Sequence, residues 1–338
     1  MKRILIIILI FVSMFEADAQ QVPLYSQYTS HPLLVNPAFA GFKNYNPLRF
    51  SSRQQWVGIE GAPTTQVLSY HGRIGKASFY DNKGLLNSEN DFDNEGNITR
   101  KRGAVFTGKE ALGGVIYNDK VGPINRSGIQ VMYAYHTELS KIRDRFNRSP
   151  NISFSGSFSL AQFVLDESQL ILYDANDPLI DGAKESLFMP DVNVGALLYT
   201  TTYFVGVSGI NLMQSKIRIN GSNNDDNRMM RHYFVVGGYK YETQSDIYIE
   251  PSFLIKATEF SPVQVDLSAR VIARNVNAGI TYRTNNDIVL MLGLKTGKYY
   301  FGYSFDYSFG NIIQYSSGSH EIVIGYNVGQ TTHSDYAF

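Results

Sequence analysis

The chain has 338 residues, of which 30 are basic and 30 acidic, so its formal net charge is zero. This balance argues against nucleic-acid binding, which calls for a basic surface, and the absence of cysteine excludes a disulfide framework and a lipid-acceptor site. The 23 Tyr and 21 Phe, against one Trp, are typical of aromatic girdles at a membrane surface.

The N-terminus has the pattern of a secretory signal. Lys2 and Arg3 are basic, residues 4–12 form a short apolar run, and residues 17–19 have the small-x-small form of a signal-peptidase site. The apolar run is too short to cross a membrane as a helix, which takes roughly 20 residues. We therefore expect a signal peptide over residues 1–19, cleaved near Ala19; a signal anchor or a buried helix is the alternative.

Residues 20–46 form a segment rich in Pro and Asn, without strand alternation. Pro32 and Pro37 hold the backbone in fixed extended or turn shapes. The apolar residues between 33 and 40 belong to no strand and have to be buried. We expect this segment to pack against the lumen wall of a barrel as a partial plug; a disordered leader is the alternative.

Residues 47–328 divide into strand-like runs at clusters of Gly, Pro, Asn and Asp. From Tyr299 to Phe309 every second residue is aromatic, a period of two that indicates a strand with one apolar face. Repeated alternation of this kind predicts an all-β fold, a transmembrane outer-membrane β-barrel of about 14 antiparallel strands with a lipid-facing outer surface. The predicted strands cover residues 48–56, 64–74, 111–119, 128–139, 151–165, 191–200, 203–212, 232–242, 246–257, 263–273, 276–284, 288–295, 299–308 and 320–328.

Loop lengths agree with a barrel in an outer membrane. If the first strand runs outward, the external connections include the long polar stretches, whereas the tight turns fall on the periplasmic side, as is typical of such barrels. A soluble β-sandwich gives no reason for this alternation. The long stretches are residues 166–190, 213–231 and 310–319, and the tight turns are residues 201–202, 244–245, 274–275 and 297–298.

Three segments depart from this plan. Residues 75–110 fall on the predicted periplasmic side, where we interpret them as an insertion or a miscounted hairpin. Residues 140–150 are also long for that side. Residues 329–338 form a C-terminal tail beyond the last predicted strand.

Alternation also assigns polar side chains to the lumen. Charges of both signs indicate paired contacts in a filled or constricted lumen, although a water-filled channel would give the same pattern. Pro251 removes a ladder donor within its strand, so we expect a bulge or a strand end near it. The predicted lumen residues are Glu250, Asp266, Arg270, Arg274 and Asp306.

The sequence offers little for catalysis, metals or cofactors. Ser319, His320 and Glu321 are the residue types of a hydrolase triad, but neighbouring strand residues point to opposite faces. Residues 91–96 imitate the start of a calcium loop, yet Arg102 stands where the closing Glu belongs, so a plain turn is favoured. The six histidines show no paired ligand spacing. We expect a non-enzymatic protein without cofactor or metal.

Eight motifs occur in order between residues 20 and 328. They are the SQY…NP start, QWVGIEGAPTTQ at residues 55–66, NDKVGPINRSG at 118–128, YAYH at 133–136, ANDP at 175–178, PSFLIK at 251–256, GYSFDYS at 302–308 and SGSHEIVIGY at 317–326. Through these motifs the chain resembles the PorP/SprF family of type IX secretion membrane proteins. The resemblance implies an outer-membrane barrel of Bacteroidota with a role in secretion, or in surface attachment of gliding-motility adhesins or other large secreted proteins.

The resulting hypothesis is a non-enzymatic outer-membrane component of the type IX secretion system that binds a secreted client and holds it at the cell surface. The expected partners are outer-membrane lipid, other type IX components and a large secreted surface protein with a type IX C-terminal signal, with no nucleic acid. The alternative is a channel or transporter for hydrophobic or small polar solutes. Because binding diversity sits on loops, the predicted client-binding residues are Asp174, Asn176, Asp177, Asn223, Asp225 and Arg228.

Overall fold

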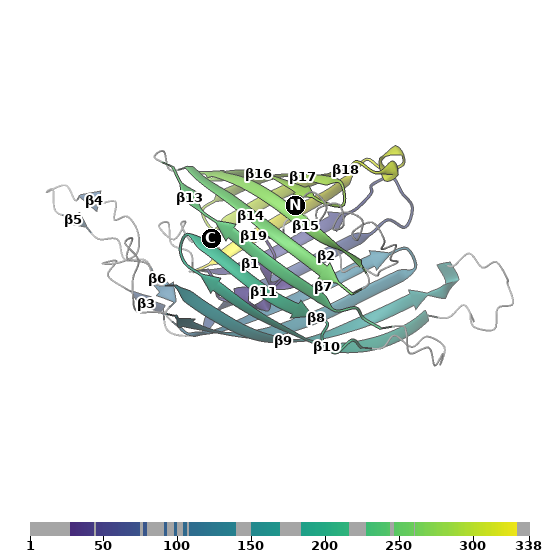
Figure 1. Ribbon diagram of the computed structural model, residues 1–338, viewed down its shortest axis with the longest axis horizontal. Helices are drawn as coiled ribbons and strands as arrows, with labels where there is room; N and C mark the ends of the chain where they lie inside the picture. The colour runs from purple at the N-terminus through teal and green to yellow at the C-terminus, as the bar shows by residue number, and fades with distance from the viewer. Residues whose placement is uncertain are drawn as a thin grey trace, which may run out of the picture.

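The computed structural model describes residues 28–43, 45–74, 77–79, 91–92, 98–99, 104–106, 108–139, 150–169, 184–215, 228–243, 247–259 and 261–329. Within them, antiparallel strands form a closed barrel (Figure 1). The barrel strands are β1 (Asn46–Gln54), β2 (Thr64–Ile74), β7 (Glu110–Val121), β8 (Ile124–Glu138), β9 (Asn151–Asp166), β10 (Lys184–Tyr199), β11 (Tyr203–Ile210), β12 (His232–Tyr239), β14 (Ile247–Thr258), β15 (Ser261–Ala273), β16 (Val276–Arg283), β17 (Asp287–Thr296), β18 (Tyr299–Ser308) and β19 (Ser319–Val328).

The barrel closes between its first and last strands. β1 pairs with β19 over its whole length, from the Asn46–Val328 pair to the Gln54–His320 pair. β13 (Tyr241–Glu242) continues β12 after a break at Lys240, and β12 and β13 both pair with β14. Counting these two as one strand, the described residues form a 14-stranded barrel, which confirms the predicted number.

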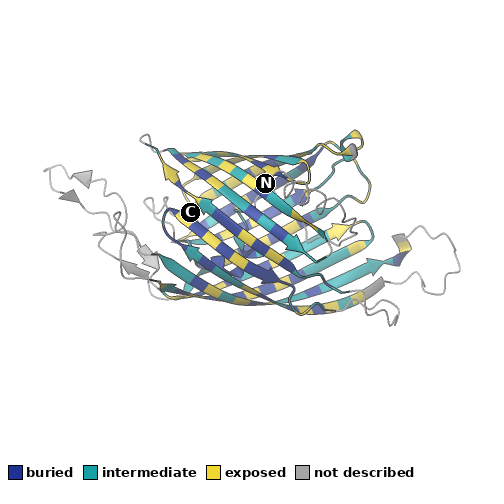
Figure 2. Cartoon of the chain, in the orientation of Figure 1, coloured by how far each residue is buried: buried dark blue, intermediate teal, exposed yellow. Residues whose placement is uncertain are grey.

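The outer wall is apolar because side chains alternate along each strand. In β18, Tyr299, Phe301 and Tyr303 are exposed on the outside, whereas Ser304 and Asp306 are buried inside. Figure 2 shows the same alternation of exposed and buried residues along the barrel strands. An uncovered apolar surface of this kind suits contact with lipid. Among the described residues, no helix has both the length and the apolar character needed to cross a membrane.

The chain connections define two ends of the barrel. We call the end where β1 begins and β19 ends the plug end, and the opposite end the loop end. The short connections at residues 201–202, 274–275 and 297–298 lie at the plug end, and residues 55–63 and 309–318 lie at the loop end.

Two strands extend further than their sequence pattern predicted. β10 begins at Lys184 instead of residue 191, and β8 begins at Ile124 instead of residue 128. Both extensions pair with β9, through the Lys184–Asp166 and Ile124–Leu165 pairs. Pro190 predicted a loop, yet β10 pairs with β9 on both sides of this residue. Because β10 pairs with β11 only from Val194 onward, Pro190 lies in an edge part of the strand, where proline is tolerated.

Pro251 lies inside β14 without ending that strand. The β12–β14 ladder stops at the Gly238–Ser252 pair and resumes with the Tyr241–Ile249 pair of β13. Pro251, which has no N–H to donate, therefore lies opposite the break between β12 and β13. This break in the neighbouring strand is the strand end that we expected near the proline.

The long connection between β2 and β7 contributes two small separate sheets. β3 (Ala77–Phe79) pairs with β6 (Ala104–Phe106), and β4 (Asp91–Phe92) pairs with β5 (Ile98–Thr99). Neither sheet joins the barrel. Most of the calcium-loop-like sequence, and the tail after residue 329, lie outside the described residues.

Candidate functional site

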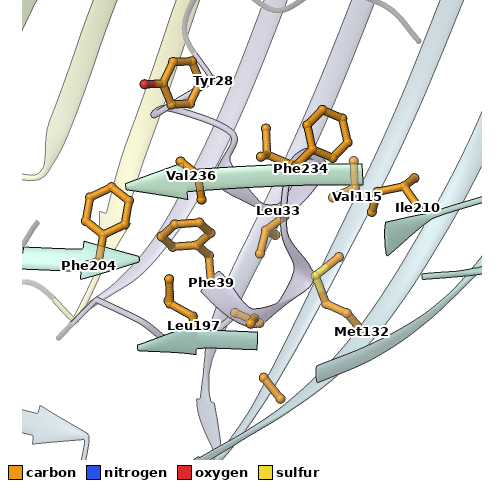
Figure 3. Packing of buried hydrophobic residues seen from close by; sticks show 14 of the residues in the cluster. Tyr28, Leu33, Phe39, Val115, Met132, Leu197, Phe204, Ile210, Phe234 and Val236 are labelled. Carbon is orange, nitrogen blue, oxygen red and sulfur yellow. The ribbon is translucent and has the colours of Figure 1, made fainter. Parts of the chain in front are cut away.

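Residues 28–43 form a plug that packs inside the lumen at the plug end. Two short 3-10 helices, η1 (Pro32–Leu34) and η2 (Pro37–Phe39), fold this segment. Leu33 and Ala38 are fully buried and Phe39 is almost so. They pack against inward-facing side chains of seven barrel strands, among them Val67, Val115, Met132, Leu197, Phe204, Phe234, Val236 and Leu254. Figure 3 shows part of this cluster, with Phe39 beside Leu197 and Phe204. The two prolines set the turns that compress this apolar segment into one core.

Asn36 attaches the plug to β10 and β11. Its side-chain carbonyl caps η2 by accepting from the backbone N–H of Ala38 at 2.9 Å. Its Nδ2 donates to the carbonyl oxygens of Ala196 (3.0 Å) and Val207 (3.1 Å). This approach needs glycine at position 195, because a Cβ there would lie 2.0 Å from Asn36 Oδ1.

A second attachment holds the plug backbone at Ala40 and Gly41. The backbone N–H of Gly41 donates to His71 Nδ1 at 3.0 Å, and Arg73 Nε donates to the Gly41 carbonyl at 2.8 Å. His136 Nε2 lies 2.7 Å from the Ala40 carbonyl, an acceptor, so this nitrogen carries the proton. The plug is therefore held by polar bonds of defined direction as well as by apolar contacts.

His31 is buried at the start of η1. Its Nδ1 lies 2.8 Å from the hydroxyl of Ser69 on β2. Burial, with the positive charge of Arg49 adding to it, lowers the pKa of the His31 imidazole from 6.5 to about 3. The ring is therefore neutral at pH 7.

A network of buried charges lines the lumen toward the loop end. Asp306 Oδ2 accepts from Arg53 Nη2 at 2.7 Å and from Arg283 Nη1 at 3.0 Å. Arg283 Nε also contacts Asp266 Oδ2 at 3.3 Å, and Arg53 Nη1 lies 3.8 Å from Glu321. Arg53 and Asp306 come from β1 and β18, which are separated by β19. The charges therefore pair along one part of the wall.

The other predicted lumen residues lie nearer the plug end or at its rim. Arg270 of β15 donates to Glu250 of β14 at 2.9 Å, and its Nη1 reaches the hydroxyl of Thr29 in the plug at 3.4 Å. Arg274 differs from the prediction. It occupies the turn after β15 with a φ of 51° and an exposed side chain, because the strand ends at Ala273.

A cavity of about 500 Å³ lies at the loop end, which we call the vestibule. The loops that contribute some of its lining residues bond to one another outside the lining itself. Val57 and Gly318 join the loops of residues 55–63 and 309–318 through a bond of 2.9 Å, and Gly61 accepts from Gly122 at 2.8 Å. The lining residues are Arg53, Gln55, Trp56, Pro63, Asp119, Val121, Asn285, Asp287, Asp306, Ser308, Gly310, Ile312 and Ser319.

Most predicted client-binding residues lie outside the described part of the chain, namely Asp174, Asn176, Asp177, Asn223 and Asp225. Arg228 is described and half-buried. It precedes Met229, which packs with Met189 and Ala161 in a second apolar cluster.

The geometry separates the residues of the triad-like sequence. Glu321 is buried on the lumen side and contacts Arg53. The Nδ1 atom of His320 lies 2.7 Å from the hydroxyl of Tyr303. The side chains of Glu321 and His320 thus lie on opposite faces of β19, as strand alternation requires.

Sequence reasoning missed Asn36, His71, His136, Arg53 and Arg283. Arg53 and Arg283 follow the same period-two pattern that placed Asp306 inside, so a full face assignment would have found them. Asn36 also carried a signal, because Asn before Pro is a favoured start of a helical turn. The roles of His71 and His136 depend on contacts with the plug, which no local pattern encodes.

Comparisons with known proteins identify a family. A family model described as "Type IX secretion system membrane protein PorP/SprF" matches residues 17–326. No curated protein matches the sequence of this chain.

Solved structures show only a distant likeness to this chain. A mutant of the Rh. blastica porin has a TM-score of 0.31 and 8% identity over 84% of this chain and 98% of that chain. The beta domain of the Bordetella autotransporter BrkA has a TM-score of 0.28 and 11% identity over 85% and 99%. Because both TM-scores are low, the fold of this chain rests on its own strand pairing. On the strength of the family model, which covers nearly the whole sequence, the chain belongs to the PorP/SprF family of type IX secretion system membrane proteins.

Proposed function

We propose that this outer-membrane component of the type IX secretion system is a non-enzymatic receptor that binds a secreted client at the loop end and holds it at the cell surface. The observation that carries the proposal is the asymmetry of the lumen. The plug end is filled by an apolar core around Leu33 and Phe39, whereas the loop end holds a cavity of about 500 Å³ with Arg53 and three aspartates in its lining. A barrel filled at one end and hollowed at the other suits binding better than transport.

The attachments of the plug support this function. Asn36, Ala40 and Gly41 each bond to groups of the barrel wall over 2.7–3.1 Å. Such bonds are costly to leave unmade in a buried site, so they favour a plug that stays in place. Rigid support beneath the loops is what a receptor needs, because it limits the conformational entropy lost on binding.

Loop deletions test client binding. Removing residues 171–182 or residues 217–226 should reduce the amount of client displayed on cells and the amount that co-purifies with the barrel. Shortening the connection at the opposite end by residues 81–90 is the matched control. Folding of each variant is checked by heat-modifiable migration on a gel. Undiminished display and co-purification after both loop deletions would contradict the proposal.

Transport is the second candidate function, and only the open vestibule favours it. Fourteen strands enclose a lumen wide enough for small solutes once the plug is absent. Conductance in planar bilayers should therefore be absent for the full chain and appear when residues 28–43 are deleted. Solute-specific conductance by the intact barrel would favour the transporter over the receptor.

A further inference from the structure

We infer that the vestibule binds a lysine- or arginine-bearing extended segment of the client. This inference deepens the proposed function, on which it rests. The vestibule is large enough, because ligand pockets typically measure about 300–1,000 Å³ and this cavity measures about 500 Å³. All of its lining residues belong to the described part of the chain.

The charge balance of the lining favours a cation. The lining contains three carboxylates, Asp119, Asp287 and Asp306, and one guanidinium, Arg53, so acidic groups outnumber basic ones. Asp306 is already engaged by Arg53 and Arg283. The charge available to a ligand therefore comes from Asp119 and Asp287.

Asp119 and Asp287 are hydrogen-bonded by neutral groups. Asp119 accepts from the Thr65 hydroxyl at 2.6 Å, and Asp287 accepts from Asn285 Nδ2 at 2.9 Å. Among the described residues neither forms an ion pair within 4.0 Å. Neutral donors alone thus bond to these two carboxylates, and no cation is directly paired with either within the described residues.

Two arginines lie near these carboxylates without lining the vestibule. Arg126 is the register partner of Asp119 on β8, and Arg283 is the partner of Asp287 on β16. Arg283 is only 1% exposed and is bonded to Asp306 and Asp266, which offsets its charge. On the Asp287 side a bound cation therefore meets a carboxylate whose neighbouring arginine is already paired, whereas on the Asp119 side it shares the carboxylate with Arg126.

The two carboxylates stand on separate parts of the wall. Asp119 belongs to β7 and Asp287 to β17, with β2, β1, β19 and β18 between them. One small ion does not reach both sides, whereas an extended segment with cationic side chains does. This separation selects a peptide over a metal ion.

Trp56 adds a second group suited to cations. It lines the same cavity and is the only tryptophan of the chain. Its φ of 44° is unusual for a bulky residue, and its backbone N–H is held by the Ser319 hydroxyl at 3.2 Å. The indole ring is the aromatic surface that attracts ammonium and guanidinium groups most strongly.

The single tryptophan provides the test. The refolded full chain is titrated with an N-acetylated, C-amidated tetralysine peptide while the fluorescence of Trp56 is followed. We expect a saturable change that weakens with salt, and no change with a tetraglutamate peptide. No saturable response to tetralysine, or an equal response to both peptides, would overturn the inference.

Charge-removing variants locate the site. Asp119→Asn combined with Asp287→Asn should weaken tetralysine binding by tenfold or more. Glu60→Gln is the matched control, because Glu60 is exposed on the first external loop but does not line the vestibule. Asp287→Asn alone provides a milder variant should the double substitution fail to fold. Equal weakening by Glu60→Gln, or undiminished binding by the folded Asp variants, would contradict the inference.

Client display separates this inference from the function beneath it. If the loop deletions abolish display but the Asp variants bind tetralysine normally, the receptor function is supported and the cation-binding vestibule is refuted. If the Asp variants lose tetralysine binding while both loop deletions leave display unchanged, the cation-binding vestibule is supported and the receptor function is refuted.

Discussion

The backbone N–H of Gly41 donates a hydrogen bond to Nδ1 of His71 at 3.0 Å. A histidine nitrogen that accepts a bond carries no proton, so this contact requires neutral His71. On the same side of the plug, Tyr199 accepts from Arg73 at 2.7 Å, which leaves its own hydroxyl proton for His136 Nδ1 at 2.9 Å. Neutral imidazoles thus hold the plug backbone to the barrel wall.

Acid should destabilise the plugged barrel through His31. The unfolded chain takes up a proton near pH 6.5, whereas folded His31 does so only near pH 3. Between these values the unfolded state binds more protons, so the free energy of unfolding falls as the pH falls, by at most about 1.4 kcal/mol per pH unit. Urea unfolding of the refolded protein at pH 7 and pH 4 measures this loss. The His31→Gln variant should lose less stability over the same range, and an identical loss would refute the assignment.

Adding a side chain at Gly195 should displace the plug. The new Cβ of Gly195→Ala would lie 2.0 Å from Asn36 Oδ1, so the two bonds from Asn36 Nδ2 cannot form. We expect a loss of about 1–3 kcal/mol in unfolding free energy and faster proteolysis at Lys43. Gly156→Ala is the control, because a Cβ there meets no atom within 4 Å. Equal stability of both variants would show that Asn36 does not anchor the plug.

Removing the shared carboxylate of the charge network should be costly. Asp306→Asn leaves Arg53 and Arg283, which are 3% and 1% exposed, without their common anion. We expect a loss of about 3–5 kcal/mol in unfolding free energy, because the two buried guanidinium groups lose the anion that they share and keep only their contacts with Glu321 and Asp266. Arg274→Gln, at an exposed turn, should change stability by less than about 0.5 kcal/mol. Urea unfolding measures both, and a loss below about 1 kcal/mol for Asp306→Asn would contradict the network.

A charge on the lipid face should be tolerated only near a rim. Ile280 lies midway along β16 and Val276 lies at its plug end, and both are exposed on the same face. Ile280→Arg should cost about 2–4 kcal/mol in a bilayer and Val276→Arg about 0–1 kcal/mol, because the cost of a cation rises toward the midplane. Unfolding from lipid vesicles measures the difference. Equal costs would place the apolar band elsewhere.

The sequence predicted the faces of strands better than it predicted where strands end or which side chains meet. The alternation from Tyr299 to Phe309 predicted the outer face and the inward direction of Asp306, because strand geometry acts within a few residues. The same rule placed Arg274 in the lumen, where it failed, because alternation does not mark where a strand turns. The prediction of a loop up to Pro190 was wrong for a related reason, because β10 pairs with β9 on both sides of this residue.

The sequence by itself determined the number of strands, the lipid-facing side of the strands with clear alternation and the family, because period and motif are local properties. Only the tertiary structure decided which residues of the lumen meet. Asn36 bonds to carbonyls 160 and 171 residues away, and Arg53 meets Asp306 across 253 residues. Such contacts depend on how neighbouring strands align when the barrel closes, and on where the plug settles inside it, and neither is written in any single stretch of the chain.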